Sequence, residues 1–180
     1  MKSRLQFAGH PIHTMVVGFP IGLYSTALLC DILYLLLADA FWFRMAFWAI
    51  LFGLVTHLGA AATGLPDFLA VMKERQEGQD LQDLKGAQRA ATSHLVFGIG
   101  LLVVQGLNLA VRHGGEVPPG GSIAMPLIVN VIGAALTGLQ GWYGGELVFR
   151  HHVGVELPEA PLPGHQGKPK EREKGPKFHY

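Results

Sequence analysis

Residues 93–111 read SHLVFGIGLLVVQGLNLAV, a run of 19 residues without an acidic or basic side chain. A helix needs about 20 predominantly apolar residues to cross a hydrocarbon core that is ~30 Å thick. Residues 16–38, 41–65 and 123–149 form three further apolar runs, each with one charged residue. Four such helices in a chain of 180 residues leave too little polar chain to cover them in water. We therefore predict an all-α transmembrane four-helix bundle, with spans at about 16–38, 41–65, 93–112 and 123–149.

The overall composition supports a location in a membrane and excludes several classes of protein. Charged residues make up 15% of the chain, against roughly 25% in soluble domains. The net charge of +1 gives no support for nucleic-acid binding, which needs a surplus of Lys and Arg. The single cysteine, Cys30, excludes an internal disulfide and a CxxC metal site. The partner that the composition predicts is the lipid bilayer.

The four spans form one membrane domain, residues 1–156, and the proline-containing polar segment 157–180 is predicted to be a disordered tail. Four spans place both termini on one side of the membrane, which we call the terminal side. Outside the tail, that side carries seven Lys and Arg residues and the opposite side carries two. The positive-inside rule then predicts that both termini are cytoplasmic. A cleaved signal peptide is the competing interpretation, but the first apolar run of about 23 residues exceeds its usual 7–15.

Each span carries one stripe of small or polar residues, which is typical of helices that pack against each other in a bilayer. In the third span the stripe keeps helical spacing and consists of His94, Gly98, Leu101, Gln105, Asn108 and Arg112. Asp31, inside the first span, needs a partner or a proton at that depth. An ion pair with Arg112 or Arg44 is one interpretation. A proton path through Asp31, Asn108 and Gln105 is the alternative.

Six of the nine histidines fall on the terminal side of the predicted bundle. Helix bundles build haem and metal sites from side chains on facing helices. A haem with two histidine ligands needs both imidazoles at one depth, and His57 and His94 differ by roughly 10 Å. We therefore predict a haem b site with its ligands on the terminal side. Gly144 and Gly145 would admit the edge of a porphyrin or a quinone there. The candidate haem ligands are His10, His13, His94 and His151, with His13 and His94 also the candidate metal ligands.

Two segments carry a resemblance to a known family. One is Gly9-His10-Pro11-Ile12-His13, and the other, residues 141–155, reads GWYGGELVFRHHVGV. Together they resemble the DUF2231 family of predicted bacterial membrane proteins, over residues 9–155. Some relatives join this bundle to Rieske-type iron–sulfur domains, so the resemblance implies a link to membrane electron transfer. The matching positions are His10, His13, Asp31, Asp67, His94, Glu146, Arg150 and His151, and His57 is not among them.

The sequence thus favours a redox function, either haem b binding or interaction with a quinone, with a redox partner protein or a quinone as the partner. In this hypothesis Asp67, Glu146 and Arg150 support the histidines, and the carboxylates orient imidazoles. No Ser-His-Asp or Cys-His arrangement is evident, so no catalytic residue is predicted and an accessory or electron-transfer protein is favoured over an enzyme. A non-catalytic membrane scaffold or assembly subunit and a small transporter or proton path remain the alternatives.

Overall fold

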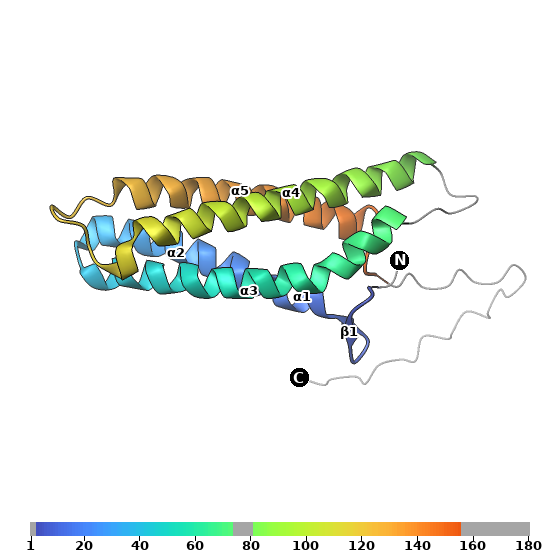
Figure 1. Ribbon diagram of the computed structural model, residues 1–180, viewed down its shortest axis with the longest axis horizontal. Helices are drawn as coiled ribbons and strands as arrows, with labels where there is room; N and C mark the ends of the chain where they lie inside the picture. Colours follow the sequence, from blue (N-terminus) through green and yellow to red (C-terminus); the bar gives the residue numbers. More distant parts are fainter. Residues whose placement is uncertain (1–2, 74–80, 156–180) are drawn as a thin grey trace, which may run out of the picture.

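Four long helices run side by side in alternating directions and form a bundle (Figure 1). They are α2 (Gly18–Leu37), α3 (Ala40–Lys73), α4 (Leu81–Val111) and α5 (Ala124–Phe149). The computed structural model describes residues 3–73 and 81–155. Within these residues, four helical segments are long and apolar enough to cross a membrane. The predicted transmembrane four-helix bundle is confirmed, while the predicted tail, residues 157–180, lies outside the described residues.

The bundle is built from two helical hairpins. Helix α2 packs along α3, and α4 packs along α5; the two hairpins then meet where α3 contacts α4 and α2 contacts α5. The turn between α2 and α3 is short because Ala38 adopts a left-handed conformation, with φ of 53°, and ends α2. The Asp39 carboxylate then accepts a hydrogen bond from the Phe41 amide at the start of α3, satisfying one of the amides that a helix start leaves unpaired.

Short elements close both ends of the bundle. At the terminal side, strands β1 (Gln6–Phe7) and β2 (His10–Pro11) pair antiparallel, and helix α1 (Ile12–Val16) follows directly. The turn between the strands requires Gly9, whose φ is 80°. At the opposite side, the 3-10 helix η1 (His113–Gly115) follows α4 and lies against α3. The β1–β2 turn and α1 place His13 beside the long helices.

The connection between the second and third spans differs from the prediction. The predicted spans leave residues 66–92 between them, but α3 continues through Pro66 to Lys73 and α4 begins at Leu81. The residues from 81 to 92 include Leu, Gln, Ala, Lys and Arg, which are good helix formers, and polarity alone does not end a helix. Both helices therefore extend beyond the apolar spans on the terminal side.

The contact between α2 and α3 depends on a glycine. A Cβ on Gly53 would lie 2.5 Å from Cε1 of Tyr24, whose side chain is buried. Gly59, on the same helix, has open space where its Cβ would be. Gly53 thus allows α2 and α3 to approach closely, as small residues do in membrane bundles.

These two glycines form a matched pair for mutagenesis. We expect Gly53→Ala to destabilise the bundle by about 1–3 kcal/mol, the usual cost of overpacking a core, and Gly59→Ala to leave it unchanged or slightly more stable. The thermal midpoint in detergent, followed by size-exclusion chromatography after heating, measures both. Equal midpoints for the two variants would show that the α2–α3 contact does not need Gly53.

Candidate functional site

His13 lies on the short helix α1, and its side chain contacts α3. Its Nδ1 lies 2.8 Å from the carbonyl oxygen of Ala60. Because a carbonyl oxygen only accepts hydrogen bonds, Nδ1 must carry the hydrogen, and Nε2 of the neutral ring keeps its lone pair. A Cβ on Gly64 would lie 2.8 Å from the same Nδ1. The glycine therefore makes room for the imidazole beside the helix backbone.

His94 on α4 repeats this arrangement against α5. Its Nδ1 lies 2.9 Å from the carbonyl oxygen of Gln140, and a Cβ on Gly144 would lie 3.1 Å from its Cε1. In both cases the accepting carbonyl and the glycine beside the ring are four residues apart, one turn along the same helix. Each hairpin of the bundle thus supplies one imidazole that is oriented through Nδ1.

The two imidazoles lie close together across the boundary between the hairpins. Their ring centroids are 6.3 Å apart, and their planes are nearly perpendicular, at 86°. His13 and His94 both line a cavity of about 390 Å³ between the helices, together with Gly144 and Gly145. Asp67 lines it as well, so five of the predicted site residues are brought together at one cavity.

His57 and Tyr24 line a deeper part of the same cavity. The Tyr24 hydroxyl lies 3.4 Å from Nδ1 of His57, and both side chains are buried. His57 was not among the predicted ligands, because its expected depth differs from that of His94 and the family motifs do not include it. Its helical spacing of three and seven residues before Ala60 and Gly64 was the signal that placed it on the same face of α3.

The other predicted ligands lie elsewhere. His10 is exposed, and its Nδ1 lies 3.0 Å from the Ala8 carbonyl oxygen. His151 packs against Gly86, with its Nδ1 2.9 Å from the Asp83 carboxylate. Neither histidine lines the cavity. The structure therefore does not bring the four predicted histidines to one point, and it separates His13 and His94 from the other two.

The residues predicted to support the imidazoles make other contacts. The Asp67 carboxylate accepts hydrogen bonds from the Ser3 hydroxyl, at 2.7 Å, and from the Arg4 amide. It thereby ties the N-terminal segment to α3, although Asp67 also lines the cavity. Glu146 and Arg150 form an ion pair along the end of α5, at 3.2 Å. Nδ1 of His13 and Nδ1 of His94 each donate a hydrogen bond to a backbone carbonyl oxygen, and not to one of these carboxylates.

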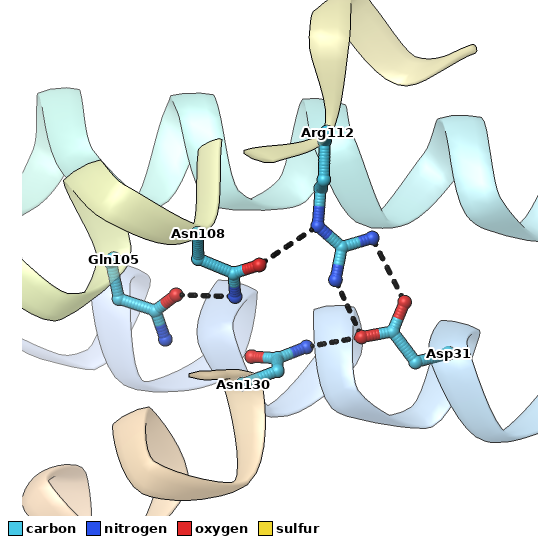
Figure 2. Close-up of polar contacts among 5 residues, drawn as sticks. All are labelled: Asp31, Gln105, Asn108, Arg112 and Asn130. Carbon is cyan, nitrogen blue, oxygen red and sulfur yellow. Dashed lines mark hydrogen bonds and ion pairs between the residues drawn. The ribbon is translucent and has the colours of Figure 1, made fainter. Parts of the chain in front are cut away.

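A buried polar network occupies the other half of the bundle (Figure 2). The guanidinium of Arg112 binds both oxygens of Asp31, at 2.9 and 2.5 Å, and both side chains have no exposed surface. Arg44, the alternative partner, instead lies 3.6 Å from Glu116 at the exposed end. Asp31 therefore pairs with Arg112, one of its two predicted partners, and both carboxylate oxygens accept hydrogen bonds.

The chain matches the model of one family, described as "Predicted membrane protein (DUF2231)", over residues 9–157. It belongs to this family. The resemblance seen in the sequence is thus confirmed, and this DUF2231 protein is an integral membrane protein of an uncharacterised family. No curated protein and no solved structure matches the chain.

Proposed function

We propose that this DUF2231 protein binds a b-type haem between His13 and His94 and transfers electrons within the membrane. The observation that carries the proposal is the pair of imidazoles from two different hairpins, each fixed through Nδ1 to a helix carbonyl and each with Nε2 available. Histidines that ligate metals commonly donate their other ring N–H to a carbonyl or carboxylate, which sets the tautomer and the orientation of the ring.

The spacing of the rings supports ligation from opposite sides of one metal. With metal–nitrogen bonds of about 2.0–2.1 Å and a ring radius of ~1.1 Å, two opposite imidazoles have centroids ~6.3 Å apart. The centroids of His13 and His94 are 6.3 Å apart. A tetrahedral site would bring the centroids of two imidazoles closer, to about 5 Å. The distance therefore favours two axial ligands over two corners of a zinc site.

The number of ligands supports a haem over a bare ion. Within residues 3–73 and 81–155, no group of three or more His, Cys, Asp or Glu side chains could hold a metal ion. Protein sites for zinc use three or four such ligands. A haem needs only one or two protein ligands, because the porphyrin supplies the rest of the coordination. Two histidines beside one cavity therefore suit a haem better than a structural metal site.

The chain's own residues would hold and tune the group. A bound haem supplies one-electron redox chemistry. The Ala60 and Gln140 carbonyls keep both Nδ1 atoms protonated and make each Nε2 a better donor to a metal. Tyr24 and His57 are polar side chains that also line the cavity. We propose that a membrane quinone or a redox protein is the electron partner.

The experiment is a titration of the purified protein with haemin in mild detergent. We expect saturation at one haem per chain, a Soret band of six-coordinate low-spin haem, and a reduced spectrum of b type after dithionite. Zinc and copper salts serve as comparison ligands and should bind more weakly than haemin. Haemin binding without saturation, or a five-coordinate spectrum, would contradict the proposal.

We further propose that both termini face the cytoplasm of a bacterial inner membrane. The surplus of Lys and Arg lies on the terminal side, where loops next to spans direct the orientation. Fusions at the C-terminus test this in bacterial cells. Green fluorescent protein should fluoresce, and alkaline phosphatase should stay inactive. An active phosphatase fusion would show that the termini face outward and that the histidine pair lies on the outer side.

A further inference from the structure

The polar network around Asp31 and Arg112 has a fixed direction of hydrogen bonding along each of two arms. Arg112 has only donors, so its Nε donates to Oδ1 of Asn108, at 3.0 Å. Asn108 must then present its amide nitrogen onward, and Nδ2 donates to Oε1 of Gln105, at 3.1 Å. The first arm therefore ends at Nε2 of Gln105, which is a donor.

The second arm starts from the carboxylate and ends with the opposite polarity. Ionised Asp31 only accepts, so Asn130 must turn its nitrogen to it, and Nδ2 donates to Oδ2 at 2.7 Å. Turning either amide over would set two acceptors or two donors against each other. The second arm therefore ends at Oδ1 of Asn130, which is an acceptor.

These two end atoms are buried and have no hydrogen-bond partner among the described residues. Gln105 and Asn130 have no exposed surface. Figure 2 shows the Asn130 oxygen on the side of its amide that faces Gln105. A Cβ on Gly133 would lie 2.4 Å from Nε2 of Gln105, so the absence of a side chain there lets the amide lie directly against α5.

We propose that a single buried water molecule bridges Gln105 Nε2 and Asn130 Oδ1. One of the two atoms belongs to a donor and the other is an acceptor, and a single water satisfies both at once. An ion does not fit, because a cation would face the Gln105 N–H and an anion would face the Asn130 oxygen. The water closes a ring that runs from Asp31 through Arg112, Asn108 and Gln105 to Asn130 and back.

The closed ring explains how a charged pair is tolerated inside a membrane span. Its two charges cancel, and the water leaves neither amide arm with an unpaired end, which is costly at low dielectric. The ring draws its members from α2, α4 and α5. It thereby fastens the first hairpin to the second at the end of the bundle opposite the histidine pair.

An experimental density map of the full chain tests the proposal directly, by crystallography or cryo-electron microscopy at a resolution that shows ordered water. We expect one isolated peak within hydrogen-bond distance of both Gln105 Nε2 and Asn130 Oδ1. Direct contact between the two amides, an empty gap, or density larger than one water would each overturn it.

A double-mutant cycle gives a second readout. If one water serves both ends, Gln105→Leu and Asn130→Leu each release it, so the double variant should lose less thermal stability than the two single losses combined. The matched control is Gln88→Leu, also on α4, whose amide donates to the Val71 carbonyl; its effect should add to that of Asn130→Leu. Additive losses for Gln105 and Asn130 would overturn the shared water.

Discussion

Replacing Asp31 with leucine is expected to cost on the order of 3–5 kcal/mol of folding stability, the largest loss from any single change considered for this protein. The variant leaves the Arg112 guanidinium, which has no exposed surface, without its counter-ion inside the bundle. It also removes the acceptor of the Asn130 amide. Little folded protein should be recovered from the membrane, and what is recovered should have a strongly lowered thermal midpoint in detergent.

Arg112→Leu should have an effect of similar size, because it leaves the Asp31 carboxylate unpaired. The double variant Asp31→Leu/Arg112→Leu should be more stable than either single variant, since neither charge then remains buried. The double variant should still be less stable than the wild-type protein, because Asn108 and Asn130 also lose hydrogen-bond partners. Arg44→Leu is the matched control: its ion pair with Glu116 is largely exposed, and we expect no measurable change. Asp31→Leu with a wild-type midpoint would show that the ion pair does not hold the hairpins together.

Replacing His94 or His13 with alanine is expected to abolish six-coordinate haem binding. Each variant removes one of the two imidazoles, whose ring centroids are 6.3 Å apart. The remaining histidine could support at most a weakly bound five-coordinate haem, so the low-spin Soret band should be lost. The apparent affinity for haemin should fall by at least tenfold, which the detergent titration measures.

His10→Ala is the control for these variants. His10 belongs to the same N-terminal segment as His13, but its side chain is exposed and its Nδ1 lies 3.0 Å from the Ala8 carbonyl oxygen. Its removal should leave the haem spectrum and affinity unchanged. Loss of the low-spin spectrum in His10→Ala but not in His13→Ala would show that His10, and not His13, is the haem ligand.

The sequence predicted the spans well because a bilayer imposes a simple rule on composition. The charge-free run 93–111 and its three companions had to be long apolar helices, and Asp31 had to find a partner such as Arg112. The helical ends of α3 and α4 beyond the spans were missed, because hydropathy reports where the lipid ends and not where a helix ends.

The details of the candidate site could be predicted only in part. His13 and His94 were named because both fall near one depth on the terminal side. The choice between His10, His13 and His151 depends on how α1 packs on α3, which residue spacing does not reveal. The Ala60 and Gln140 carbonyls were missed because a backbone acceptor leaves no trace in residue type. Gly64 and Gly144 were the visible signs that something must approach those helices closely.

If His13 and His94 hold one haem between them, as proposed, electron paramagnetic resonance of the oxidised protein will report the angle between their rings. Nearly perpendicular imidazole planes, as in the 86° arrangement here, predict a highly anisotropic low-spin ferric signal. Parallel planes would give the more rhombic low-spin signal instead. We expect the highly anisotropic signal from the wild-type protein and its loss in His94→Ala. A well-folded wild-type protein that gives only a high-spin signal, or that takes up no haem at all, would contradict this proposal.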